Sequence, residues 1–230
     1  MKSPSIGRGL ALVLIAGFLA WTAVHALGSR PPESPKLPFP APAMDTPLAS
    51  ARSEQTAVLA GGCFWGIQAV FEHLKGVSAV SAGYAGGRIK SPSYESVSLG
   101  VTGHAESVSI TYDSSQVTYG QLLMVYFSVA HDPTQWNRQG PDTGSQYRSV
   151  IFFTNAEQKR IAQAYISQLD SAKVYSRKIV TVVEPYKAFY PAEDYHQDYL
   201  RNNPGNPYII YNDLPKLENL KKIFPALYRP

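Results

Sequence analysis

The chain has 230 residues, of which 44% are hydrophobic and 17% charged, with a net charge of +4 and one cysteine. This composition is typical of a globular protein of one domain with appendages, and a single cysteine excludes both an intrachain disulfide and a zinc site built from several cysteines. The basic residues are scattered rather than clustered, which argues against nucleic acid as a partner.

Residues 1–27 have the pattern of an export signal. Lys2 and Arg8 precede an apolar run whose uninterrupted part, residues 10–20, is shorter than the roughly 20 residues that span a bilayer comfortably. Cleavage of this segment and its retention as a membrane anchor both stay open. Either outcome predicts a folded part outside the cytoplasm, in the periplasm or at the outer face of the inner membrane.

Residues 28–50 hold seven of the 18 prolines. A segment of this kind favours extended polyproline conformations and has little to bury, so it predicts a semi-rigid linker. The folded, catalytic domain is then expected over residues 51–230.

Strand and helix patterns alternate through the rest of the chain. Apolar or alternating runs predict strands at residues 58–60, 77–87, 107–113, 147–153 and 178–185. Helical spacing follows Cys63, capping boxes open helices at Thr118 and Thr154, and a short helix is expected over residues 214–224. These elements predict an α+β fold: a two-layer sandwich of a mixed sheet and packed helices, with a ferredoxin-like core and a long, loop-rich C-terminal segment.

Cys63 stands at a predicted strand-to-helix turn. Gly61 and Gly62 allow the backbone to turn sharply there. A cysteine at a helix N-terminus faces unpaired N–H groups, which favour the thiolate and lower the thiol pKa. The residue is therefore a candidate nucleophile, although a free cysteine is also often an inert, buried side chain.

Phe64 and Trp65 follow the cysteine directly. Adjacent residues on a helix do not share a face, so at least one of the two rings points away from the main apolar stripe. They are either two core aromatics or the walls of an apolar pocket beside the thiol.

The sequence "GGCFWG" at residues 61–66 resembles the signature of the peptide-methionine sulfoxide reductases of the A type. Further segments resemble the family in the same order along the chain: "SPSYESV" (91–97), "GHAESV" (103–108), "HDPTQWNRQGPDTGSQYRSVIF" (131–152), "FYPAEDYHQDYL" (189–200) and the Asn/Pro-rich stretch that follows. The resemblance covers residues 55–210, which is nearly all of the predicted folded part.

The resemblance implies four catalytic residues. Cys63 attacks the sulfur of methionine sulfoxide, and Glu106 donates a proton to the oxygen as it leaves. Tyr94 and Tyr147 donate hydrogen bonds to the same oxygen. This chemistry needs a proton donor because oxide is a poor leaving group in a dry pocket.

The resemblance also implies the residues that bind substrate. Phe64 and Trp65 hold the ε-methyl group, Asp142 contacts the substrate backbone or orients the tyrosines, and His196 and Tyr199 complete the pocket. The implied substrate is the S epimer of methionine sulfoxide, both free and in exported proteins. Neither a metal nor a bound cofactor is expected, because the cysteine carries both electrons and becomes a sulfenic acid.

One departure from the family concerns recycling. Many members carry further cysteines that resolve the sulfenic acid, and this chain has none. An external thiol, either a small thiol or a thioredoxin-like protein, is therefore expected to reduce Cys63 directly. We expect the enzyme to be a monomer.

Two other functions compete with this interpretation. A thiol peroxidase would also use an activated cysteine, but an apolar pair of rings beside the thiol favours a thioether-like ligand. A binding or chaperone module that recognises oxidised methionine without reducing it would not need the carboxylate and the tyrosines together.

Overall fold

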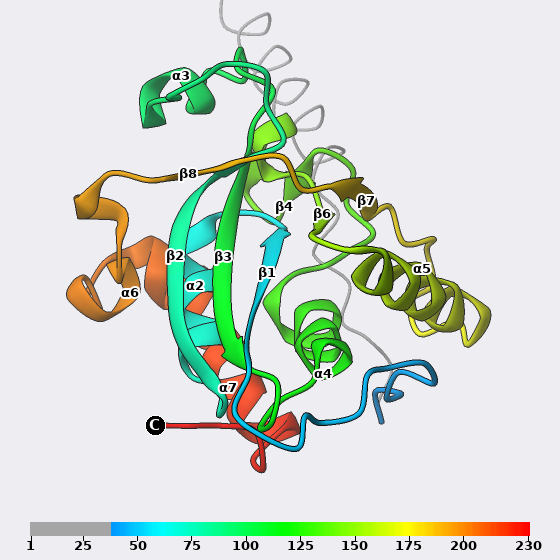
Figure 1. Cartoon of the computed structure of the whole chain (residues 1–230). Helices are drawn as coiled ribbons and strands as arrows, with labels where there is room; N and C mark the ends of the chain where they lie inside the picture. Colours follow the sequence, from blue (N-terminus) through cyan, green and yellow to red (C-terminus); the bar gives the residue numbers. More distant parts are fainter. Residues whose placement is uncertain (1–37) are drawn as a thin grey trace, which may run out of the picture. The chain divides into compact units, whose positions relative to one another are not determined.

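The computed structural model describes residues 38–230 (Figure 1). The predicted export signal or anchor at residues 1–27 and the first part of the predicted linker lie outside the described residues. None of the helices in the described part is long and apolar enough to cross a membrane.

Six strands form one sheet in the order β7-β6-β1-β3-β2-β8. Neighbouring strands are antiparallel except for β6 and β7, which are parallel. The strands are β1 (Glu54–Ala60), β2 (Val77–Ala85), β3 (Ala105–Asp113), β6 (Val150–Phe153), β7 (Val182–Pro185) and β8 (Phe189–Pro191). A separate two-stranded hairpin consists of β4 (Arg138–Gln139) and β5 (Asp142–Thr143).

Figure 1 shows α2 behind β2 and β3, α7 near their lower ends and α4 beside β1. Buried side chains of these three helices share one core with those of the sheet. The longer helices are α2 (Phe64–Glu72), α4 (Tyr119–Val125), α5 (Ala156–Ser171) and α7 (Leu214–Ile223). Short elements are α3 (Tyr94–Ser98), α6 (Tyr199–Asn202), η1 (Tyr126–Ala130), η2 (Ser145–Tyr147), η3 (Asp194–His196) and η4 (Ile209–Asp213). The succession β1-α2-β2-β3-α4-β6, with the spatial order β6-β1-β3-β2, confirms the predicted ferredoxin-like core.

The core lies between the sheet and these helices. Ile67, Val70 and Phe71 recur at helical spacing and are fully buried, so α2 packs its apolar stripe against the sheet. Alternate residues of β3, such as Val108 and Ile110, are buried on the same side. Each such side chain stabilises the fold by about 1.5–3 kcal/mol.

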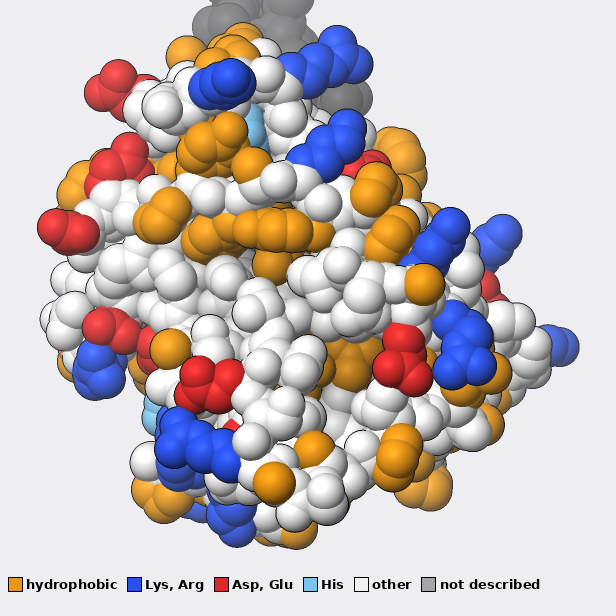
Figure 2. All heavy atoms as spheres, in the orientation of Figure 1, with side chains coloured by type: hydrophobic (Ala, Val, Ile, Leu, Met, Phe, Trp, Pro, Cys, Tyr) orange, Lys and Arg blue, Asp and Glu red, His pale blue; other side chains and the backbone are white. Residues whose placement is uncertain are grey.

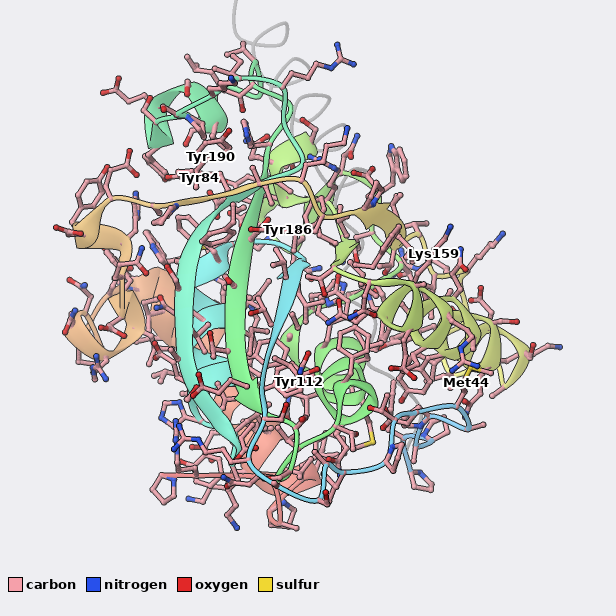
Figure 3. The ribbon with its side chains drawn as sticks, in the orientation of Figure 1. Met44, Tyr84, Tyr112, Lys159, Tyr186 and Tyr190 are labelled. Atoms are coloured by element: carbon pink, nitrogen blue, oxygen red, sulfur yellow. The ribbon has the colours of Figure 1, made fainter. Side chains whose placement is uncertain are left out.

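The opposite face of the sheet, turned toward the viewer in Figure 2, has few charged side chains at its centre and a hydrophobic band across its upper half. Figure 3 places Tyr186 and Tyr190 in this upper region, in the β7–β8 segment that crosses the sheet. Half-buried Ser109 and Thr111 alternate along β3 with its buried apolar residues. The strands therefore follow the alternating pattern of a sheet that is covered by helices on one face.

The predicted linker extends too far toward the C-terminus, because the end of this segment is packed. Phe39 is buried in the core, and the carbonyl of Pro40 accepts a hydrogen bond of 2.6 Å from the Tyr165 hydroxyl. Asp45 accepts hydrogen bonds from the Thr118 hydroxyl and from the N–H of Gly120 at the start of α4. The folded unit thus includes residues well before position 51, because one aromatic ring and one carboxylate find partners there.

The two predicted capping boxes have different outcomes. Thr118 caps α4, accepting from the N–H of Gln121 while the Gln121 side chain accepts from the N–H of Thr118, as predicted. The prediction at Thr154 is wrong by one residue, because Asn155 caps α5 by accepting from the N–H of Gln158. Asn and Thr are both favourable N-cap residues, so the path of the backbone decides which of the two adjacent residues caps the helix.

Candidate active site

Cys63 is the N-cap residue of α2, directly after the turn that ends β1. The turn requires glycine for two reasons. A Cβ at Gly61 would lie 2.8 Å from the His131 ring, and Gly62 has a φ of +97° with the Gln139 side chain 2.5 Å from where a Cβ would be. The two glycines therefore let the backbone pass close to its neighbours and place the sulfur at the first turn of the helix.

Replacing Gly62 by alanine is expected to destabilise the fold by at least about 1 kcal/mol, because alanine is strained at positive φ and its methyl group overlaps Gln139. Urea unfolding of the full chain measures this effect. Gly205 is a suitable control site because nothing lies within 4 Å of its added Cβ. If Gly62→Ala and Gly205→Ala unfolded at the same urea concentration, position 62 would not require glycine.

Glu106 reaches the same helix end from β3. It shares a strand face with the buried residues Val108 and Ile110, so its side chain points to the side of the sheet that the helices cover. Its Oε2 accepts a hydrogen bond of 3.1 Å from the N–H of Phe64, the residue after the cysteine. Burial raises the pKa of Glu106 to about 8, with a smaller contribution from the charge of Asp142. At neutral pH this carboxyl therefore carries its proton.

The expected lowering of the Cys63 pKa is wrong for the free enzyme. The side chain is only 8% exposed, and its burial raises the thiol pKa well above its ordinary value. The charges of Asp213 and Asp142, and of Glu106 once it ionises, act in the same direction, whereas the backbone N–H of Trp65 favours the thiolate. Desolvation thus outweighs the helix end, and Cys63 rests as a neutral thiol.

Tyr94 and Tyr147 come to this site from separate segments, the first turn of α3 and the end of η2. Burial raises the pKa of both phenols, and the nearby Glu106 and Cys63 raise it further whenever they are ionised. The two hydroxyls therefore keep their protons and can donate hydrogen bonds to a developing oxyanion.

Asp142 lies at the edge of this group, where its carboxylate accepts a hydrogen bond from the Tyr208 hydroxyl. Burial raises the pKa of Asp142, while the Tyr208 hydrogen bond and the charge of Lys216 oppose the shift. Its charge also acts on Glu106 and Tyr147.

An aromatic wall completes the site. Phe64 is fully buried with its ring 5.2 Å from that of His196, whereas Trp65 is half-buried and stacks on Tyr199 at 3.7 Å. The indole N–H of Trp65 donates to Nδ1 of His196 over 3.1 Å, and the His196 ring lies 4.2 Å from that of Tyr94. Both rings after the cysteine thus contact His196, but Phe64 also packs in the core beside Tyr84, whereas the less buried Trp65 stacks on Tyr199. The structure brings all nine predicted site residues together.

The sequence did not single out Tyr208 or Asp213. The Tyr208 ring meets Trp65 edge-on at 5.8 Å, and its hydroxyl holds Asp142. Asp213 is buried beside Gly66 in the first turn of α2 and pairs with Lys216 over 3.0 Å. The signal for both was slight: a tyrosine within an Asn/Pro-rich stretch and a carboxylate before a predicted helix.

A cavity of about 600 Å³ lies at the other end of α2. Its lining includes Glu72, whose pKa burial and the neighbouring Asp198 raise to about 8, and the cationic residues Arg201 and Arg229. Arg201 pairs with Asp198, and Arg229 binds backbone carbonyls of Glu72 and Val77. This cavity is distant from the sulfur along the helix. Within residues 38–230, no group of three or more His, Cys, Asp or Glu side chains is arranged to hold a metal ion.

Comparisons with known proteins agree with this geometry. The model of the family "Peptide methionine sulfoxide reductase" matches residues 55–227. A peptide methionine sulfoxide reductase of Mesorhizobium japonicum is 64% identical over 179 residues, which cover 78% of this chain and 92% of that protein. One of Synechocystis sp. is 51% identical over 191 residues, 83% of this chain and 89% of that protein.

Among solved structures, methionine sulfoxide reductase A of Corynebacterium diphtheriae superposes with a TM-score of 0.58 at 34% sequence identity. The match covers 78% of this chain and 87% of that one.

Proposed function

The chain belongs to the peptide methionine sulfoxide reductase family and reduces methionine sulfoxide; on that premise we propose how its residues divide the work. Cys63 supplies the electrons, Glu106 supplies the proton, and the hydroxyls of Tyr94 and Tyr147 stabilise the oxygen. Phe64 and Trp65 enclose the methyl group, and His196 and Tyr199 hold Trp65. Asp142, fixed by Tyr208, orients the substrate or the phenols.

The single observation that carries this proposal is the position of a protonated carboxyl next to the thiol. Glu106 accepts from the N–H of the residue after Cys63, and its raised pKa of about 8 makes it a proton donor at neutral pH. Burying an ionised carboxylate costs free energy, so a buried carboxyl without a cation beside it keeps its proton and has that proton to give.

The reaction balances without any added group. The Cys63 sulfur attacks the sulfoxide sulfur and forms an S–S bond, while Glu106 protonates the oxygen and the sulfoxide S–O bond breaks. The released oxygen then bonds to the Cys63 sulfur as the S–S bond breaks, and the electron pair of that bond stays on the methionine sulfur. Two electrons pass from the Cys63 sulfur to the substrate sulfur, and the thiol proton restores Glu106. The products are methionine and a sulfenic acid on Cys63.

An external thiol completes the cycle, because the chain contains no other cysteine. Its thiolate attacks the sulfenic sulfur and releases water, and a second equivalent of thiol frees Cys63 from the mixed disulfide. A small thiol and a thioredoxin-like protein both have this chemistry.

We further propose that the enzyme acts on the S epimer, is a monomer, and repairs exported proteins in the periplasm or at the outer face of the inner membrane. The support for this location is the basic, apolar segment at residues 1–27. The support for the epimer is the family resemblance around Cys63.

The pH dependence of single-turnover reduction follows from the two pKa shifts. Below about pH 8 Glu106 stays protonated, so the rate rises about tenfold per pH unit with the thiolate fraction. Above about pH 8 each gain in thiolate is offset by a loss of the acid, so the wild-type profile levels off. In the Glu106→Gln variant, which has no acid to lose, the rise continues past that pH. Parallel wild-type and variant profiles would contradict the assigned proton donor.

A stereochemical assay tests the proposed function as a whole. The full chain is given each epimer of a blocked methionine sulfoxide, with either a small dithiol or a thioredoxin as reductant, and methionine is measured. We expect turnover of the S epimer only. Faster turnover of hydrogen peroxide than of either sulfoxide would instead identify a peroxidase, and tight binding without reduction would identify a recognition module.

A further inference from the structure

Three exposed aromatic residues lie near the active site in the chain: Trp136, Tyr195 and Tyr211, called here the aromatic rim. Their exposed fractions are 66%, 64% and 79%. Each belongs to a different segment and is one to three residues from a side chain that touches the site. Large apolar groups exposed beside a reactive site are typical of a surface that binds a partner.

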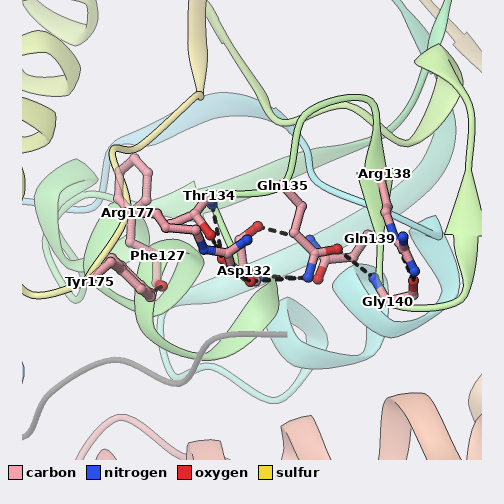
Figure 4. A network of polar contacts seen from close by, with 9 residues as sticks. All are labelled: Phe127, Asp132, Thr134, Gln135, Arg138, Gln139, Gly140, Tyr175 and Arg177. Atoms are coloured by element: carbon pink, nitrogen blue, oxygen red, sulfur yellow. Dashed lines mark hydrogen bonds and ion pairs between the residues drawn. The ribbon is translucent and has the colours of Figure 1, made fainter. Parts of the chain in front are cut away.

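The exposed Trp136 stands on a loop whose neighbouring residues are tied together by polar contacts. Figure 4 shows these contacts between Asp132 and Gly140. The carboxylate of Asp132 accepts from the N–H and the hydroxyl of Thr134, at 2.9 and 2.7 Å, and from the Gln135 amide at 3.0 Å. Arg177 pairs with the same carboxylate over 3.2 Å. The residues just before Trp136 are therefore fixed by a buried, charged network.

The residues after Trp136 are fixed equally well. The Gln139 side chain accepts from the N–H of Asp132 and donates to its carbonyl, both over 3.1 Å, and Gln135 accepts from the N–H of Gly140. Asn137 adopts a φ of +48°, a left-handed conformation that Asn accepts more readily than most other residues. Such a loop presents the indole with little entropy left to lose on binding.

The same network fixes the loop relative to the sulfur. The Gln139 side chain packs against Gly62, the residue before Cys63. Trp136 precedes Gln139 by three residues, and three residues of chain span at most about 10 Å. The Trp136 backbone therefore lies within about 10 Å of Gln139, beside the turn that carries the nucleophile. The loop then continues into β5, which carries Asp142.

The other two members of the aromatic rim flank the aromatic wall. The Tyr195 ring lies 4.3 Å from that of His196, which accepts the hydrogen bond from Trp65. Tyr211 follows Tyr208 by three residues, and Tyr208 meets the Trp65 ring edge-on. Of the three exposed rings, Tyr195 thus contacts a residue of the pocket, and Trp136 and Tyr211 stand on separate segments three residues from side chains that contact it or its turn.

We propose that the aromatic rim, with Trp136 as its fixed anchor, binds the unfolded polypeptide on either side of an oxidised methionine. This inference rests on the proposed function, whose site the rim adjoins. An extended chain advances about 3.3 Å per residue, so a ring on the loop beside the Cys63 turn would meet side chains a few positions from the sulfoxide. Aromatic rings suit the apolar neighbours that a buried methionine exposes when its protein unfolds, and free methionine sulfoxide has no such neighbours.

The test compares two substrates of the full chain. One is a blocked methionine sulfoxide, and the other is a nine-residue peptide with leucine three positions to each side of the oxidised methionine. Trp136→Ala is expected to lower kcat/KM for the peptide about tenfold, mainly through KM, and to leave the blocked amino acid unchanged. Trp136→Tyr, which keeps a ring, should recover most of the loss.

Tyr186→Ala is the matched control, because Tyr186 is also a partly exposed aromatic residue. Its N–H donates to the carbonyl of Phe153, at one end of β6, whereas the turn that carries Cys63 follows Ala60, which pairs with Val150 at the other end of that strand. It should change neither substrate. An unchanged peptide rate for Trp136→Ala overturns the inference, and so does an equal loss for both substrates, which would indicate a distorted loop. If the wild-type enzyme reduces neither sulfoxide, the proposed function fails, and this inference fails with it.

Discussion

Replacing Cys63 by serine is expected to abolish reduction of methionine sulfoxide, a loss of roughly 10⁴-fold or more. Serine has nearly the same size, but its oxygen is a far weaker nucleophile and cannot be oxidised to the equivalent of a sulfenic acid. The measurement is methionine released in one turnover with excess substrate, where the enzyme itself is the only source of electrons.

Binding should survive this substitution, because the aromatic wall of Phe64, Trp65 and His196 stays in place. The variant should therefore bind methionine sulfoxide with about the wild-type affinity and unfold at about the wild-type urea concentration. Reduction that persists in Cys63→Ser would remove the cysteine from the mechanism.

Replacing Glu106 by glutamine is expected to slow the single-turnover rate by about 10²–10⁴-fold at neutral pH, the usual contribution of a general acid. The amide oxygen can still accept from the N–H of Phe64, so the first turn of α2 keeps its hydrogen bond. What is lost is the proton that a carboxyl with a pKa of about 8 would give to the leaving oxygen.

Glu193 offers a matched control for this loss. Its carboxylate also binds residues of the site, accepting from the Tyr84 hydroxyl and from the N–H of Tyr94, but hydrogen bonds to its charged form hold its pKa below the usual range. An ionised group cannot act as the acid, so Glu193→Gln should reduce the rate far less than Glu106→Gln. Equal losses in the two variants would mean that Glu106 serves only to shape the site.

Much of the fold is predictable from local patterns. The helical spacing of Ile67, Val70 and Phe71 and the alternation along β3 each identified an element correctly, because burial on one face leaves a periodic trace in the sequence. The docking of residues 38–50 was not predictable in this way. It depends on single contacts, such as Tyr165 with the carbonyl of Pro40, which have no period.

In the candidate site, too, some features are visible in the sequence and others depend on contacts across the fold. Its residue types and their order resemble a known family, and the structure gathers them around Cys63. The state of the thiol was wrongly predicted, because the helix end is visible in the sequence whereas burial and the carboxylates that converge on the sulfur are not. Tyr208 and Asp213 were missed for a related reason: both act through contacts across the fold, which no local pattern in the sequence shows.

The most direct test of the account is the mass of the intact enzyme after one turnover without reductant. We expect one equivalent of methionine and a protein heavier by one oxygen atom, located on Cys63 and removed by an added thiol. Methionine formed by an enzyme of unchanged mass, or a disulfide-linked dimer as the only oxidised product, would contradict it.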